Sequence, residues 1–255
     1  MVVGRRHDHD AGGDAGLLTA KAALREEVWG ALAEPGVSRF PGPDGRIPNF
    51  VGAEAAAERL RGLEQWQDAA TVKANPDSPQ LPVRQRALED GKTVFMAVPR
   101  LAGEAPFFRL EAESLPVPPR RAASLTGASR YGELVALDEL EPVDVAVVGS
   151  VGVSADGARL GKGGGFSDLE FALAHEAGLI DDHTVMVTTV HERQVLDTGR
   201  IPEADHDVRL DVIVTPERVI HCRHGRRRHA RPRIRWYELT DEKIEAIPVL
   251  QRLRP

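Results

Sequence analysis

Residues 161–165 read GKGGG and lie directly before a segment with the composition of a helix. Glycine amides can approach phosphate oxygens closely because no Cβ intervenes, and consecutive N–H groups form a nest for an anion. The following helix would turn its positive end toward the same anion, and Lys162 would add a mobile charge. The stretch matches neither a Walker A loop nor the GxGxxG fingerprint. It therefore leaves two interpretations open, a phosphate cradle or a flexible loop with a solvated lysine.

Acidic residues in two places could hold a metal ion beside such a cradle. Asp168 is either a partner of its helix dipole or a ligand of Mg²⁺, which commonly uses one or two carboxylates plus phosphate oxygens. Further along the chain, Asp205, Asp207 and Asp211 precede an apolar run. One of these three could supply a second carboxylate, although Asp205 and Asp207 are equally typical of a solvated loop.

Two basic residues and one histidine are the remaining candidates for chemistry. Lys21 and Arg25 lie four positions apart in a helical pattern, so they share one helix face and either bind an anion or face solvent. His191 follows an apolar run at the place where α/β sites collect functional residues. It is either a general acid or base or a hydrogen-bonded structural residue.

Helical segments alternate with apolar runs along most of the chain. Thr19 is a candidate N-cap for the first helix, and Ser167 with Glu170 form a capping-box pattern for the helix after the glycines. Residues 143–153 are the clearest buried strand. The other predicted helices cover 52–63 and 82–91, and the other predicted strands cover 69–73, 92–98, 106–112, 184–190, 209–215 and 217–222.

This alternation predicts an α/β fold, a three-layer sandwich with a mostly parallel sheet and helices on both faces. Residues 1–17 are rich in glycine and charge and are expected to form a disordered leader, and 18–255 a single domain. Ligands of such sheets bind beyond the carboxyl ends of the strands, so the glycine-rich stretch is expected there.

Composition bounds the compartment and the partners. The formal net charge is −6, which makes nucleic acid an unlikely partner even though residues 223–235 form a basic run. Cys222 is the only cysteine, which indicates a reducing, cytoplasmic location. The apolar runs are too short to span a bilayer, so we expect no membrane association. Both a monomer and a homodimer are compatible with this composition.

Taken together, these segments resemble the 5-formyltetrahydrofolate cyclo-ligase family, also called methenyltetrahydrofolate synthetase. Members carry Lys and Arg four apart on the first helix, "RLGxGxGYYD", and an acidic motif before a strand; here these are Lys21 with Arg25, "RLGKGGGFSD" and "HDVRLDVIVT". Segments such as "RIPNFVGA", "GKGGGFSDLEFA" and "IPVLQRLR" are similar to a divergent branch, the methenyltetrahydrofolate synthetase domain-containing proteins.

The resemblance implies an α/β protein that binds MgATP and converts 5-formyltetrahydrofolate to 5,10-methenyltetrahydrofolate. Lys162, Gly163, Gly164, Gly165 and Phe166 would also border the folate-like substrate. Asp168 and Asp207 would hold Mg²⁺. By position, the ATP contacts would come from Lys21, Arg25, Arg159, Leu160, Gly161, Lys162, Gly163, Gly164, Gly165, Phe166 and Ser167.

Two further functions remain open. One is an ATP-dependent enzyme acting on another small acidic substrate, in a related one-carbon or vitamin reaction such as one linked to thiamine. The other is a nucleotide- or RNA-binding paralogue without catalytic activity, which would use the basic run.

Overall fold

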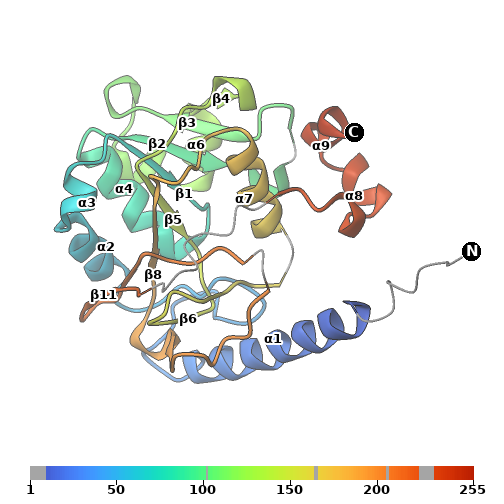
Figure 1. The fold of residues 1–255 in the computed structure, drawn as a ribbon. Coiled ribbons are helices and arrows are strands. Elements are labelled where there is room, and N and C mark those ends of the chain that lie inside the picture. Colours follow the sequence, from blue (N-terminus) through green and yellow to red (C-terminus); the bar gives the residue numbers. More distant parts are fainter. Residues whose placement is uncertain (1–9, 102, 164–165, 205–206, 224–232) are drawn as a thin grey trace, which may run out of the picture.

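An eight-stranded sheet forms the centre of the computed structural model, which describes residues 10–101, 103–163, 166–204, 207–223 and 233–255 (Figure 1). Its strands are β1 (Thr71–Ala74), β2 (Thr93–Ala97), β3 (Phe107–Leu110), β4 (Glu133–Val135), β5 (Val145–Val148), β8 (Val185–Thr189), β10 (Val212–Val214) and β11 (Val219–His221). Their order is β11-β10-β8-β5-β1-β2-β3-β4. The five strands from β10 to β2 are parallel, and the antiparallel strands β11, β3 and β4 form the edges.

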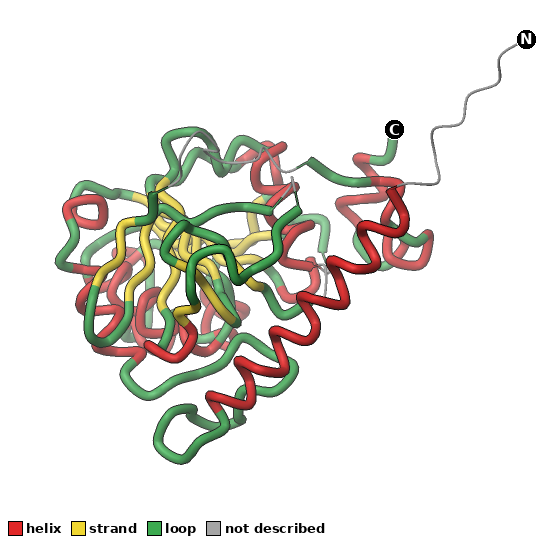
Figure 2. The backbone as a smooth tube through the Cα atoms, turned by 60° about the horizontal axis from the view of Figure 1, so that its bottom comes forward, coloured by secondary structure: helices red, strands yellow, loops and turns green. Residues whose placement is uncertain are grey.

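Helices cover both faces of this sheet, which confirms the expected three-layer α/β fold (Figures 1 and 2). One face packs on α2 (Ala53–Arg61), α3 (Glu64–Gln67), α4 (Leu81–Glu89), α5 (Pro119–Ala122) and α6 (Leu125–Tyr131). The other face packs on α7 (Phe166–Glu176), α8 (Asp241–Glu245) and α9 (Pro248–Leu253).

Successive residues of the central strands enter the two cores in turn, because side chains alternate across a strand. In β1, Val72 and Ala74 belong to the core under α2–α6. Lys73, between them, lies on the opposite face, where its ammonium stands 4.8 Å from the ring centroid of Phe171 in α7. The central strands are mostly apolar because both faces are covered, and Lys73 is the charged residue among them. The lysine in β1 is therefore an exception that needs a reason.

A smaller sheet and the first helix form a third packing unit. The sheet contains β6 (Gly152–Ser154), β7 (Arg159–Leu160) and β9 (Val195–Leu196), in the order β7-β6-β9. The long helix α1 (Asp10–Leu32) lies along the outside of the molecule beside β6 (Figures 1 and 2). Its apolar face packs against this sheet through Leu24, Val28, Trp29 and Leu32.

The predicted strand 143–153 is in fact two strands. It belongs to the main sheet from Val145 to Val148, and the chain joins the small sheet from Gly152 to Ser154. The break falls at Gly149, where a Cβ would lie 2.9 Å from Ile47 Cγ1 and 3.0 Å from Asp77 Oδ2. Tertiary contacts of this kind leave no trace in the local apolar pattern that predicted one strand.

The start of α1 also differs from the prediction. The helix begins at Asp10, so residues 10–17 of the expected leader are helical, and residues 1–9 lie outside the described residues. Thr19 is not the N-cap: it lies inside the helix, and its hydroxyl donates to the Ala15 carbonyl at 2.9 Å. A threonine hydroxyl can bond the carbonyl one turn back, so it also fits a helix interior.

In the part of the chain that the structure describes, none of the helices combines the length and the apolar composition that crossing a membrane requires.

Short 3-10 turns complete the chain. The turns are η1 (Ser78–Gln80), η2 (Pro99–Leu101), η3 (Ala112–Ser114), η4 (Leu137–Glu139), η5 (Glu192–Gln194) and η6 (Trp236–Glu238).

Candidate functional site

A cavity of about 410 Å³ lies at the carboxyl ends of β1, β2 and β5. Its walls come from residues of the segments 41–49, 75–78 and 97–101, together with Gly149, Leu125 and three charged side chains, Arg159, Lys162 and Glu170. The carboxyl ends of parallel strands are where α/β proteins bind their ligands. The cavity therefore lies where the topology predicts a site.

The glycine-rich loop passes over two arginine side chains at the edge of this cavity. Arg25 of α1 donates from Nε to the Gly161 carbonyl at 2.7 Å. Gly163 has φ of +87°, and a Cβ there would lie 2.9 Å from the Arg25 guanidinium carbon. Arg159 donates from Nη1 to the Gly149 carbonyl at 2.9 Å. Glycine is therefore required at 163 both for the left-handed backbone and for the close approach of Arg25.

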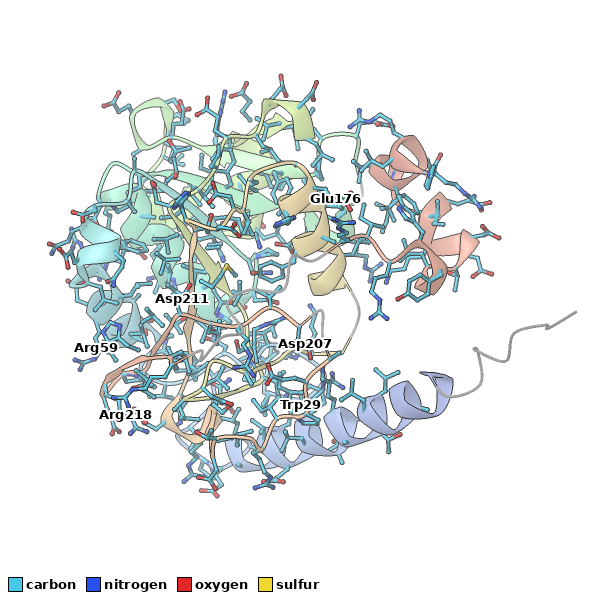
Figure 3. All side chains as sticks on the ribbon, viewed as in Figure 1. Trp29, Arg59, Glu176, Asp207, Asp211 and Arg218 are labelled. Atoms are coloured by element: carbon cyan, nitrogen blue, oxygen red, sulfur yellow. The ribbon has the colours of Figure 1, made fainter. Side chains whose placement is uncertain are left out.

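Lys21, one turn before Arg25, meets the acidic segment. Its Nζ lies 2.5 Å from Asp207 Oδ2, and both side chains are largely buried. Asp207 Oδ2 also accepts from the Ala204 amide at 2.8 Å. The segment is fixed to the small sheet because the Leu210 amide donates to the Gly157 carbonyl at 2.8 Å. Asp207 thus lies on the side of the molecule that faces α1 (Figure 3).

Three polar side chains, Lys73, Asn75 and Glu170, form a buried cluster at the cavity. They are 0%, 5% and 7% exposed, and Lys73 and Glu170 form an ion pair. The Asn75 side-chain amide lies 3.4 and 3.3 Å from the two Glu170 oxygens. Asn75 and Glu170 also line the cavity, so the cluster forms part of the surface that a ligand would touch.

Asp77 projects toward the same cavity from the loop after β1. Burial raises the pKa of its carboxyl, the charge of Glu170 raises it further, and Lys162 opposes both effects. The Lys162 ammonium lies 3.7 Å from Asp77 Oδ1. A carboxyl with a raised pKa can hold or accept a proton closer to neutral pH than an ordinary aspartate.

Arg84 of α4 fixes the loop that carries Asn75 and Asp77. Its guanidinium donates to the carbonyls of Asn75, Pro76, Asp77 and Ala123. Complete burial lowers the pKa of Arg84 to about 10, and the Asp77 charge partly opposes this. A cation surrounded by carbonyl oxygens orders that loop and holds one wall of the cavity in place.

The wall formed by the end of β2 carries backbone strain. Arg100 and Leu101 have φ of 57° and 55°, a left-handed conformation that side chains other than glycine rarely adopt. The Leu101 side chain is 2% exposed, and its packing in the core under α7 compensates the strain. Strain of this kind is concentrated at ligand sites.

The structure places the described residues that the sequence predicts for the site in pairwise contacts or at the cavity, and only two of those named next line it. Lys21 meets Asp207, Arg25 meets the glycine loop, and Arg159 and Lys162 line the cavity. Leu160 is different, because its side chain is completely buried in the core beneath α1. A contact with ATP could involve only its backbone.

The remainder of the predicted loop is only partly described. Gly164 and Gly165 lie outside the described residues, and Phe166, Ser167 and Asp168 are described only as backbone of α7. The second predicted metal ligand, Asp168, therefore stays a prediction. The capping-box interpretation of Glu170 is wrong, because its carboxylate pairs with Lys73 across the core.

His191 does not line the cavity. Its Nδ1 accepts from the Arg193 amide at 3.1 Å, and its ring stands edge-on to Phe50. Burial lowers the pKa of the imidazole, and the charge of Arg193 adds to this. These contacts favour the structural interpretation: His191 caps the turn η5.

Sequence reasoning did not assign a role in the site to Lys73, Asn75, Asp77 or Arg84. The available signal was a charged residue inside an apolar segment, as at Lys73 within TVKA and Glu170 within an aliphatic helix. Charged side chains are seldom fully buried unless they are paired. Such positions mark a polar site even before its partners are known.

The model of the 5-formyltetrahydrofolate cyclo-ligase family matches residues 16–216. The chain belongs to this family. A bovine methenyltetrahydrofolate synthase domain-containing protein is 39% identical over 246 residues, which cover 92% of this chain and 62% of the relative. The human protein of the same description is 35% identical over 243 residues, 92% of this chain and 61% of the relative. The chain therefore spans about three fifths of the length of these relatives.

The fold of this cyclo-ligase family member also matches a solved structure. The NMR structure of the 5,10-methenyltetrahydrofolate synthetase of Aquifex aeolicus superposes with a TM-score of 0.53 and 22% identity, covering 82% of this chain and 96% of the other. At this identity the likeness establishes the α/β fold alone. The roles of individual residues need a separate argument.

Proposed function

We propose that this protein uses MgATP to convert 5-formyltetrahydrofolate to 5,10-methenyltetrahydrofolate. One observation carries the proposal beyond family membership: a cavity at the carboxyl ends of the central strands lies directly beside a glycine-rich loop with basic side chains. Arg159 and Lys162 line that cavity, and Arg25 bonds the loop. A nucleotide and a small substrate could thus meet at one place.

The reaction needs the two ligands side by side. The formyl oxygen of an amide is a poor leaving group, and transfer of the γ-phosphoryl group of ATP to that oxygen activates it. The bond between this phosphorus and ADP breaks as the new P–O bond forms. N10 of the folate then attacks the formyl carbon and loses its proton, and inorganic phosphate departs. Holding both reactants in one orientation removes a large part of the barrier.

The basic side chains would bind the triphosphate. Arg25, Arg159 and Lys162 converge on the glycine loop, whose amides would contact the phosphate oxygens. Lys21 would neutralise further negative charge after its ion pair with Asp207 opens. Each of these groups would stabilise charge on the transferred phosphoryl group.

The carboxylate of Asp207 is of the kind that magnesium prefers. The carboxylate of Asp207 lies beside Lys21, and Mg²⁺ in nucleotide sites is held by one or two carboxylates with phosphate oxygens. Phosphate oxygens would complete the coordination, as is usual for Mg²⁺ held by one or two carboxylates. Asp207 and Asp168 would hold the ion, which neutralises phosphate charge when bound.

Asp77 is suited to hold the proton that N10 loses. It lines the cavity, and burial raises its pKa. A base works best when its pKa lies close to the working pH. Lys162, 3.7 Å from Asp77 Oδ1, would favour the carboxylate before the transfer.

The direct test is the absorbance of 5,10-methenyltetrahydrofolate after the purified protein is mixed with 5-formyltetrahydrofolate and MgATP. Arg25→Gln should weaken ATP binding roughly 10- to 100-fold, because hydrogen bonds to a charged group are lost. Calorimetric titration with ATP measures this without requiring turnover.

Arg200→Gln is the matched control. Arg200 forms an exposed ion pair with Glu27, which lies on the same helix as Arg25. ATP binding should therefore be unchanged in this variant. Absence of product at saturating substrates would exclude the cyclo-ligase reaction. Equal ATP affinity for Arg25→Gln and the wild type would exclude the proposed nucleotide site.

A second candidate is an ATP-dependent enzyme for another small substrate. The observation that favours it is the charged cluster of Lys73 and Glu170 at the cavity. These charges fix which hydrogen-bonding groups a ligand must present, and a small molecule other than a folate can present them. A comparison of ATP turnover with 5-formyltetrahydrofolate and with other small acids would separate the two candidates.

A further inference from the structure

The buried cluster of Lys73, Asn75 and Glu170 has no clear benefit for folding. Lys73 is completely buried in the middle of the sheet, and Glu170 lies opposite in α7. Taking two charges out of water is costly, and well-packed apolar residues often replace a buried ion pair without loss of stability. The neighbouring positions in β1, Val72 and Ala74, are apolar. The ion pair therefore points to a role at the cavity.

The cluster fixes the Glu170 carboxylate in one orientation. Lys73 binds one of its oxygens, and the Asn75 amide lies 3.3–3.4 Å from both. Lys73 also donates to Asn75 Oδ1 at 3.4 Å. A carboxylate has about four acceptor positions. Because Glu170 lines the cavity, it can accept further hydrogen bonds from a ligand there.

The cavity has two chemically different parts. Asp77, Glu170 and the Asn75 side chain contribute acceptors from the loop after β1 and from α7. Lys162 and Arg159 contribute cations beside the glycine loop. A ligand that fits both parts presents N–H donors to the carboxylates and negative charge to the cations.

We propose that Glu170, positioned by Lys73 and Asn75, determines specificity by accepting hydrogen bonds from the amino-substituted nitrogen heterocycle of the substrate. The inference rests on the proposed function, because it assumes that this cavity holds the substrate. It extends that function by naming a residue that would bind the edge of the substrate's ring, in addition to the residues that would bind the phosphates of ATP. A flat ring with adjacent ring N–H and exocyclic NH₂ groups offers donors to the acceptor positions of Glu170 that remain beside Lys73 and Asn75.

Two small probes test this without turnover. Isocytosine carries adjacent N–H and NH₂ donors, and pyrimidin-4-one is the same ring without the amino group. In an NMR titration, the wild type should bind isocytosine roughly tenfold more tightly than pyrimidin-4-one, because one hydrogen bond to a charged acceptor differs. The side-chain NH₂ signal of Asn75 should shift only with isocytosine.

Three variants complete the experiment. Glu170→Gln should lose the preference for isocytosine. Because this change leaves Lys73 without its partner, the double variant Lys73→Met/Glu170→Gln removes both charges and should lose the preference with an intact fold. Glu176 lies on the same helix as Glu170, and its carboxylate accepts from the Ile234 amide. Glu176→Gln should therefore keep the preference.

The inference is overturned if the wild type binds both probes equally or binds neither, or if the preference survives in the double variant. Product formation from 5-formyltetrahydrofolate without a preference for isocytosine would contradict the inference and would still support the proposed function. A probe preference without product would support the inference and exclude the cyclo-ligase reaction.

Discussion

Asp77 carries a charge that its surroundings disfavour. Its carboxyl is desolvated and lies near the negative Glu170, and the attraction of Lys162 does not restore an ordinary pKa. Gly149 leaves the space that Asp77 Oδ2 occupies, since a Cβ at that position would lie 3.0 Å from it. Retaining a disfavoured carboxylate inside a cavity fits chemistry better than stability.

Asp77→Asn should stabilise the protein at neutral pH. A carboxyl with a raised pKa binds its proton more tightly in the folded than in the unfolded state, so the free energy of unfolding falls as the pH rises through the folded-state pKa. Asn removes this fall. Urea unfolding at about pH 7 should give a higher midpoint for Asp77→Asn than for the wild type, and the difference should shrink at about pH 4.

Asp197→Asn is the control, because Asp197 is exposed and should give no difference at either pH. Product formation should fall at the same time in Asp77→Asn, since the variant cannot accept a proton. A lower midpoint for Asp77→Asn at neutral pH would show that the charged form is favoured in the fold.

Residue types predicted part of the site and missed the rest for a physical reason. Lys21, Arg25 and Asp207 were assigned from spacing and motif, and the structure brings Lys21 and Asp207 together. The partners of Glu170 could not be predicted, because Lys73 is 97 positions away and reaches it only through the alternation of β1 and the packing of α7.

The glycine loop is the element on which nucleotide binding depends. Gly163 has a left-handed backbone, and the Arg25 guanidinium occupies the space beside its Cα. Local pattern predicted such a loop but not which glycine is indispensable. The longer helices and most strands of the large sheet were predicted, whereas the short helices α3, α5, α6, α8 and α9 and the strands β4, β7 and β9 were not. The division of 143–153 between two sheets depends on contacts of Gly149 with distant segments.

Gly163→Ala should cost stability and weaken ATP binding. The left-handed backbone alone costs about 1 kcal/mol for alanine, and the new methyl group would displace Arg25. Gly199→Ala is a close control, since Gly199 has φ of +77° and nothing within 4 Å of its Cβ position. Both variants should unfold at lower urea concentrations. Only Gly163→Ala should lose ATP affinity, by roughly tenfold; equal losses in calorimetry would contradict the role of Arg25.

Over the whole molecule, the proposed nucleotide site joins segments from both ends of the chain. α1 packs on the small sheet, the acidic segment bonds to the same sheet through Leu210, and Lys21 meets Asp207 between them. The contact between Lys21 and Asp207 cannot be predicted from the order of the segments, because it depends on how the small sheet packs beside the large one. MgATP bound there should therefore order α1 and residues 207–211 together.

Asp207→Asn tests this arrangement. The neutral side chain keeps its size but is a weaker ligand for Mg²⁺ and a weaker partner for Lys21. In the wild type, ATP should bind more tightly with Mg²⁺ than without, because the positive ion would attract both the triphosphate and the carboxylate of Asp207. In the variant, this difference should shrink by roughly tenfold, the order of one lost charge-assisted contact. Calorimetric titrations of ATP with Mg²⁺ and with EDTA measure both affinities.

Asp197→Asn is the control: the wild-type carboxylate is exposed, so its replacement should leave both affinities unchanged. The magnesium-free affinity decides between two roles of Asp207. If it competes with the triphosphate for Lys21, the variant should bind ATP more tightly than the wild type in EDTA, because Lys21 is released. An unchanged magnesium effect in Asp207→Asn would instead show that the ion is held without this residue, and the Lys21–Asp207 pair would then serve only to fasten α1 to the acidic segment.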